Sequence, residues 1–288
     1  MDPEELDAWR ARPGFPAARD AALASLVALF DANRLLLRLL SDRGRLIMLA
    51  AALHLDLSAD PADPTSGLTV GRLKAIFVST GLGSATRASA MIALTRWAGY
   101  LAPAPTPADR RLQRMVATPR LVEAMRTMWA DQIAAVAALE PDLAPLPGRL
   151  AQRAVLAAFV AEVTRRYLAG FRFSDVVPEL TAALDRNSGL AVLAELALAG
   201  AEGHSVSGLA RRFGVSRPHV LAILADAQAR GLIARDGEGL QGLVVLPALH
   251  EALDRFQAAN FAFTAACARV ALAAVGDFLR DRPAEDNY

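Results

Sequence analysis

The chain has 288 residues, 54% of them hydrophobic, and its 31 basic residues nearly balance 30 acidic ones. No uncharged apolar run reaches the roughly 18 residues that a membrane-spanning helix needs, and Asp2, Glu4 and Glu5 give the N-terminus the wrong charge for a secretory signal. The single cysteine, Cys267, excludes an internal disulfide and a cysteine-based zinc site. We therefore expect a soluble, cytoplasmic, mainly helical protein with no membrane partner.

Hydrophobic spacing predicts a helix over residues 19–40 and a buried apolar helix over 45–55. Proline, aspartate and glycine mark residues 60–67 as a loop. A long amphipathic helix follows from 121 to 136. The prolines and glycine of residues 141–148 end that helix and predict a linker.

The second half of the chain repeats this plan. Residues 155–167 predict an amphipathic helix, residues 189–199 an apolar one, and residues 249–270 a long closing helix. Each half therefore runs from a long helix through a buried helix to a basic segment and another long helix. This order indicates an internal duplication with halves 1–145 and 146–288.

Charge is unevenly placed along the chain. Residues 68–120 carry eight basic side chains and one acid, Asp109, and residues 204–245 carry five basic side chains and three acids. The rest of the chain is net acidic. Clustered basic residues bind polyanions, so a nucleic acid partner would bind at these two segments.

The second basic segment has the pattern of a helix-turn-helix. A short helix is predicted over 206–213, followed by a glycine-bearing turn that ends at the N-cap residue Ser216. A second helix then runs to about Arg230, with Pro218 in its first turn, where a missing N–H is harmless. Residues 234–246 predict two short strands in a hairpin.

The first basic segment aligns with the second at a constant offset of 132 residues over the second helix. Ser84 aligns with Ser216, and Gly99 with Gly231. The preceding helix, which contains Leu73, aligns at an offset of 136. The sequence therefore predicts four extra residues in the turn of the first copy.

Two helices, a glycine-bearing turn and a hairpin are the parts of a winged helix, which we expect at about 68–118 and 204–246. The most specific piece is the run of residues 109–118, Asp-Arg-Arg-Leu-Gln-Arg-Met-Val-Ala-Thr. It is similar to the wing of the MarR family of bacterial transcription regulators. The chain as a whole resembles two MarR-like winged helix-turn-helix units fused in tandem.

The resemblance implies DNA contacts from the exposed start of the first recognition helix and from its wing. The residues concerned are Ser84, Thr86, Arg87, Ser89, Arg110, Arg111 and Arg114. Arg111 would reach a minor groove, and Asp109 would orient it. Because Lys74 is the only lysine among the 31 basic residues, solvated surface is the alternative interpretation of each arginine.

The second copy departs from the family pattern in its wing. Its wing lacks the Asp-x-Arg motif and carries two acids, Asp236 and Glu238. The DNA contacts that the resemblance implies in this copy are Arg211, Arg212, Ser216, Arg217, His219 and Arg235.

MarR-like proteins bind palindromes as two-fold dimers through their terminal helices. The resemblance thus implies a fold that is mainly α with small β-hairpin wings, in which long helices join two units into a monomeric pseudo-dimer. Recognition helices 84–98 and 216–230 would enter successive major grooves of double-stranded DNA. A small-molecule or protein effector would bind near Met125, Met128 and Trp129, for which core packing is the other interpretation.

The resemblance implies a sequence-specific transcription regulator, and two other classes of function are its alternatives. A regulatory protein-interaction module, with winged helices that no longer bind DNA, is the alternative. Catalysis is not expected, because Gly203–Ser207 departs from the Gly-x-Ser-x-Gly pattern and follows a helix. The four histidines lack metal-ligand spacing, so neither a metal nor a cofactor is expected.

Overall fold

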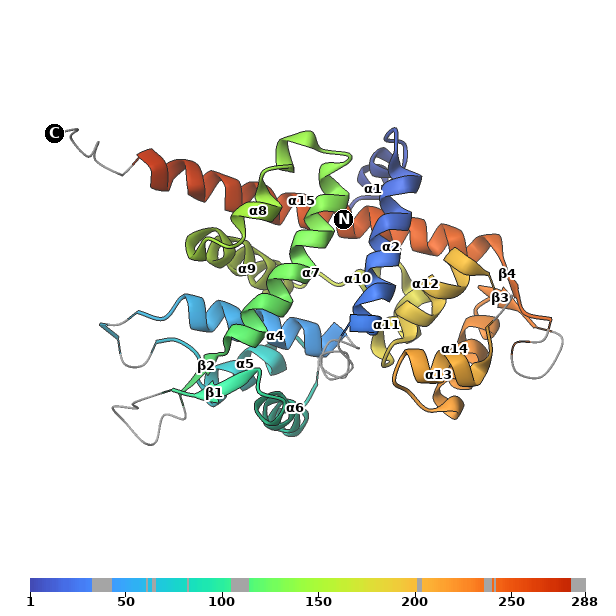
Figure 1. Cartoon of the computed structure of the whole chain (residues 1–288), viewed down its shortest axis with the longest axis horizontal. Helices are drawn as coiled ribbons and strands as arrows, with labels where there is room; N and C mark the ends of the chain where they lie inside the picture. Colours follow the sequence, from blue (N-terminus) through green and yellow to red (C-terminus); the bar gives the residue numbers. More distant parts are fainter. Residues whose placement is uncertain are drawn as a thin grey trace. The chain divides into compact units, whose positions relative to one another are not determined.

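A computed structural model describes residues 1–32, 43–60, 62–63, 66–81, 83–104, 114–200, 204–235, 240 and 242–280 (Figure 1). The structure is mainly helical (72%), and its described residues also form two small antiparallel strand pairs. This confirms the predicted class, mainly α with small β-hairpins. None of the described helices combines the length and the apolar character needed to cross a membrane.

The chain divides into two compact units, each assembled from two stretches of sequence. Unit 1 contains Met1–Leu46 and Arg172–Ala262, and unit 2 contains Ile47–Phe171 and Phe263–Tyr288. Each unit holds one of the two predicted winged-helix segments. The predicted boundary between residues 145 and 146 falls inside unit 2.

Unit 1 begins with two helices that precede the first basic segment and continues with the elements around the second one. Its elements are α1 (Pro3–Arg10), α2 (Phe15–Ala32), α10 (Phe173–Val176), the 3-10 helix η2 (Pro178–Leu180), α11 (Thr181–Asp185), α12 (Gly189–Ala199), α13 (Val206–Arg212), α14 (Arg217–Ala229), β3 (Ile233–Ala234), β4 (Val244–Val245) and the first part of α15 (Pro247–Arg280).

Unit 2 contains the elements around the first basic segment and the helices that follow it. These are most of α4 (Arg43–Leu57), then α5 (Val70–Ser79), α6 (Ala85–Trp97), β1 (Leu101–Pro103), β2 (Met115–Ala117), α7 (Pro119–Ala137), the 3-10 helix η1 (Pro141–Leu143), α8 (Leu146–Arg149), α9 (Arg153–Leu168) and the remainder of α15.

The same order of elements therefore occurs twice. We call α5, α6, β1 and β2 the first repeat motif, and α13, α14, β3 and β4 the second repeat motif (Figure 1). Helices α6 and α14 each have 13 residues. Each is followed by a glycine with positive φ, Gly99 at 75° and Gly231 at 67°, 132 residues apart. Positive φ suits glycine because it has no Cβ.

All four extra residues of the first repeat motif were predicted in its turn, but the structure places only one of them there and three in the helix before it. Helix α5 has 10 residues and α13 has 7, whereas the connections 80–84 and 213–216 differ by one residue. Each helix ends close to a glycine with positive φ, Gly81 or Gly214. The later glycine of the first copy lets α5 continue for almost another turn.

The proline-rich residues 141–148 do not form a linker. They contain η1 and α8, and prolines occupy the starts of both, where a missing N–H is not needed. Three leucines in and beside these helices have no exposed surface: Leu143, Leu146 and Leu150. These leucines anchor an otherwise largely exposed segment to the interior of unit 2.

The core of unit 1 is built on α12, whose residues Ala191–Leu196 are all buried. Its start is tightly constrained. Ser188 has a φ of 60°, and its hydroxyl donates to the Phe213 carbonyl oxygen at 3.2 Å. A Cβ on Gly189 would lie 2.4 Å from the Ala183 carbonyl oxygen. The start of α12 thus fixes how α11 and α13 pack.

The core of unit 2 includes the residues considered for an effector pocket. Met125, Met128 and Trp129 are buried on α7, and the Trp129 ring centroid lies 5.4 Å from that of Phe159 on α9. Aromatic pairs at this distance stabilise a core. The structure therefore favours core packing for these three side chains.

Candidate nucleic-acid interface

The start of α6 displays the polar side chains that were predicted to contact DNA. Ser84 caps the helix by accepting a hydrogen bond from the Arg87 backbone N–H at 3.2 Å. Thr86, Arg87 and Ser89 are exposed, and the Ser89 hydroxyl donates to the Ala85 carbonyl oxygen at 2.9 Å. The opposite face of α6 is buried. The predicted residues therefore share one exposed helix face.

Gly83 positions this face against α5. A Cβ at Gly83 would lie 2.8 Å from Phe77 Cε1 and 2.9 Å from Arg87 Cδ. The absence of a side chain lets the Phe77 ring and the stem of Arg87 meet at the turn. The direction of Arg87 is thus coupled to the packing of the two helices.

Several arginines of the first basic segment also tie the β-hairpin to its surroundings. Arg114, a predicted DNA contact, is half-buried and donates to the Ser66 carbonyl oxygen at 2.9 Å. Arg72 donates to the Gly67 carbonyl oxygen at 3.0 Å. Arg120 donates in the same way to a backbone carbonyl and lies over the ring of Tyr100. All these acceptors are neutral carbonyl oxygens, so these hydrogen bonds leave the positive charges of the arginines in place.

The predicted wing residues Asp109, Arg110 and Arg111 lie outside the residues that the structure describes. The strands on either side of them are described. Leu101 pairs with Ala117, and the register is antiparallel. The contribution of the wing to DNA binding stays a prediction.

The start of α14 has the same cap as α6. Ser216 accepts a hydrogen bond from the His219 backbone N–H at 3.3 Å, and Pro218 lies in the first turn. Arg211 and Arg217 are exposed and form no ion pair with any residue that the structure describes. Ser216, Arg211 and Arg217 are therefore accessible, and their contact with DNA stays a prediction.

Two other predicted contacts of the second repeat motif have partners inside unit 1. Arg212 forms an ion pair with Glu195, a buried carboxylate on α12, and His204 Nε2 lies 3.4 Å from the same carboxylate. His219 Nε2 donates to the Asn187 carbonyl oxygen at 2.9 Å. Sequence reasoning missed Glu195, although it is the one acid in the apolar run 189–199.

Arg235 follows β3 at the edge of the second wing. Its backbone carbonyl accepts a hydrogen bond from Gln228 Nε2 at 3.4 Å, and its side chain is half-buried. Residues 236–239 beyond it lie outside the described part of the chain.

Sequence reasoning also missed Trp97. Its side chain is 76% exposed in the last turn of α6, next to Arg96 and above a shallow hollow formed by Ala93, Leu101 and Pro103. The other two tryptophans of the chain are buried. The exposed face of α6 therefore runs from hydroxyl and guanidinium groups at its start to an indole at its end.

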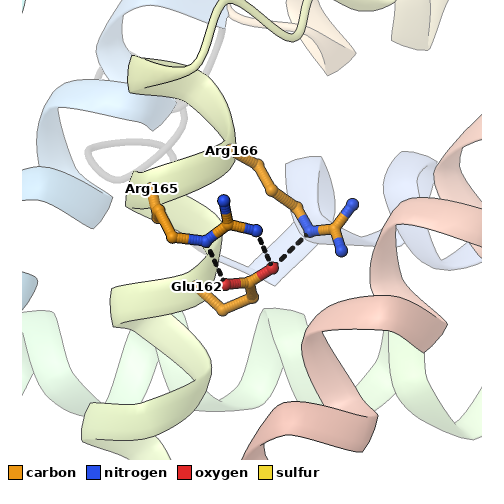
Figure 2. Close-up of polar contacts among 3 residues, drawn as sticks. All are labelled: Glu162, Arg165 and Arg166. Carbon is orange, nitrogen blue, oxygen red and sulfur yellow. Dashed lines mark hydrogen bonds and ion pairs between the residues drawn. The ribbon is translucent and has the colours of Figure 1, made fainter.

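A second charged cluster lies on α9, which belongs to neither repeat motif (Figure 2). Glu162 is buried and accepts hydrogen bonds from Arg165 Nε at 2.6 Å and from Arg166 Nε at 2.7 Å. The bond from Arg165, followed by the other interactions with both arginines, lowers the pKa of Glu162. The buried carboxylate of Glu162 is therefore paired with two arginines, which is typical of a structural ion-pair cluster.

Cys267 lies close enough to this cluster to interact with Arg166, but burial raises the pKa of its thiol to about 12. A thiol that stays protonated is a poor nucleophile. Among the described residues, histidine, cysteine and carboxylate side chains do not gather into a group that could hold a metal ion.

Comparisons with known proteins supply no relative. No protein-family model, no curated protein and no solved structure matches the chain. A functional assignment therefore depends on the two repeat motifs and on the charges around them.

Proposed function

We propose that the protein is a transcription regulator that binds double-stranded DNA sequence-specifically, with α6 and α14 as the recognition helices of two MarR-like winged helices in one chain. The observation that carries the proposal is the repeated presentation of a serine-capped 13-residue helix, 132 residues apart, with its polar start exposed. In helix-turn-helix proteins this part of the second helix contacts base edges.

The charge of the first repeat motif supports a polyanionic partner. Residues 68–108 contain no acidic residue, although they include α5, α6 and β1. The exposed start of α6 also presents the positive end of the helix dipole, which favours phosphate. Polar side chains for base contacts and cations for phosphates thus occur on one surface.

The alternative function, a protein-interaction module, is favoured by one observation on the second repeat motif. Leu221 on α14 is 39% exposed and Val244 on β4 is 55% exposed. Exposed apolar side chains suit a protein partner better than phosphate. Under the proposed regulator, this surface would serve an effector or partner.

Fluorescence anisotropy tests the proposal. The probes are a duplex from the DNA upstream of the protein's own gene and a duplex of the same composition with a scrambled sequence. We expect tight binding to the first, weaker binding to the second, and a steep loss of affinity with salt. Equally weak binding to both duplexes would contradict the proposal and favour the protein-interaction module.

A further inference from the structure

Helices α6 and α14 have the same local geometry, so residues 132 positions apart occupy equivalent places on them. Each begins after a serine cap with extended backbone, with φ of −76° at Ser84 and −79° at Ser216, and each has 13 residues. Ala88 and Val220, the fourth residue of each helix, are both fully buried. An exposed position at the start of one helix therefore has a direct counterpart on the other.

The exposed side chains at two of these positions have different chemistry in the two copies. The first and fifth residues are Ala85 and Ser89 in α6 but Arg217 and Leu221 in α14, and all four are exposed. Residues four apart share one face of a helix. In helix-turn-helix proteins the start of the second helix contacts base edges. Under the proposed function, both positions therefore face the bases.

On α6 these two positions can accept a hydrogen bond but have no free side-chain donor. The Ala85 side chain has no polar atom, and the Ser89 hydroxyl already donates to the Ala85 carbonyl oxygen at 2.9 Å. The hydroxyl oxygen keeps its lone pairs as acceptors. In the major groove, the base groups that can donate to it are the amino groups of adenine and cytosine.

On α14 the same two positions provide donors and no acceptor. Arg217 has five N–H donors and forms no ion pair with any residue that the structure describes. The side chain of Leu221 forms no hydrogen bonds. Guanine presents two acceptors in the major groove, O6 and N7, and an arginine can bind both at once.

The arginines at the starts of the two helices are also out of register. Arg217 is the first residue of α14, whereas Arg87 is the third residue of α6. The counterpart of Arg87 is His219, whose Nε2 donates to the Asn187 carbonyl oxygen at 2.9 Å. Neither arginine therefore has an arginine at the equivalent place in the other copy.

We infer that the DNA target of the protein is not a palindrome. Helix α14 contacts a half-site in which a guanine binds Arg217, and α6 contacts a half-site in which an adenine or a cytosine binds Ser89. This inference rests on the proposed function. Identical recognition helices contact identical half-sites, whereas these two helices require different ones.

Selection of bound duplexes from a random library, followed by sequencing, tests the inference. We expect the unsubstituted protein to enrich two half-sites of different sequence. An inverted repeat, or a single half-site, would overturn the inference and leave sequence-specific DNA binding standing. Enrichment of no sequence at all would overturn the proposed function as well.

Arg217→Ala tests the guanine contact, with Arg211→Ala as its control. Arg211 is also exposed and forms no ion pair with a described residue, but it lies on α13, the helix expected to contact phosphates. Replacing the guanine pair in the selected duplex should weaken binding of the unsubstituted protein about 5- to 150-fold. Arg217→Ala should reduce this ratio to about 1, since no bidentate contact is left to lose. Arg211→Ala should weaken binding to both duplexes and keep the ratio.

Anisotropy titrations give the ratio, and circular dichroism at increasing temperature checks that both variants are folded. An unchanged ratio in Arg217→Ala would overturn the role of Arg217 in base recognition. Loss of the guanine preference in both half-sites would overturn its assignment to one of them.

Discussion

Gly189, the first residue of α12, has no space for a side chain. Its Cβ would lie 2.4 Å from a backbone oxygen that cannot rotate away, the carbonyl of Ala183. We expect Gly189→Ala to lower the free energy of unfolding by about 2 to 4 kcal/mol, because α12 has to shift within a packed core. Urea unfolding followed by circular dichroism measures this.

Gly71 in α5 is the matched control. A Cβ there meets nothing within 4 Å, so Gly71→Ala leaves packing unchanged. We expect no loss of stability and a gain of up to about 1 kcal/mol from helix propensity. Similar effects of the two substitutions would contradict the close approach described at Gly189.

Glu162 makes the stability of unit 2 depend on pH. Its pKa is lowered in the folded state, chiefly by the hydrogen bond from Arg165. Its contribution is therefore fully present above the ordinary value of 4.5 and is lost as the pH falls through the lower folded pKa. We expect Glu162→Gln to cost about 1 to 2 kcal/mol at pH 7 and much less near pH 3.

Glu123→Gln provides the comparison. Glu123 also accepts hydrogen bonds from an arginine three residues later, Arg126, but its side chain is 61% exposed. Solvent screens such a pair, so this substitution should change the urea midpoint very little at either pH. A Glu162→Gln penalty that does not shrink in acid would exclude the carboxylate as its source.

The serine caps of α6 and α14 act on whole helices. Each serine oxygen accepts a hydrogen bond from a backbone N–H in the first turn, for which the helix itself has no carbonyl acceptor. We expect Ser84→Ala and Ser216→Ala each to cost about 1 kcal/mol of stability, and Ser84→Asn to retain it. Thermal unfolding of the three variants checks this, and loss of stability in Ser84→Asn would refute the capping role.

Elements with marked ends were predictable from the sequence. Helix α12 occupies the predicted residues 189–199, α14 begins directly after the predicted cap Ser216, and α6 begins directly after Ser84, which aligns with it. Serine and glycine at helix ends are local signals that need no tertiary information. Proline is ambiguous, because it starts helices as well as loops, and residues 141–148 were therefore predicted wrongly.

The partners of charged side chains could not be predicted in this way. Arg212 and Glu195 are 17 residues apart, and Arg186 and Asp226 are 40 apart. Each pair forms because separate helices pack together, and hydrophobic periodicity carries no information about that contact. The sequence therefore indicated which arginines lie in or near α6 and α14 but not which of them form ion pairs with other helices.

At the scale of the whole molecule, one chain carries both repeat motifs. If α6 and α14 act as recognition helices, as proposed, the protein needs no second copy to present two of them. We expect light scattering after size-exclusion chromatography to give the chain mass of 30.5 kDa, both with and without bound DNA once the duplex mass is subtracted. A protein mass of twice that value would refute the monomeric pseudo-dimer.

The duplication within one chain has a consequence for how the protein changes over time. In a homodimer every mutation enters both subunits at once, so the two surfaces stay identical and the target stays palindromic. Here the serine caps and the positive-φ glycines recur in both copies, whereas Arg96 in one copy aligns with Gln228 in the other. Each copy can therefore change in sequence independently of the other. One copy can gain a new binding partner while the other copy keeps its original partner.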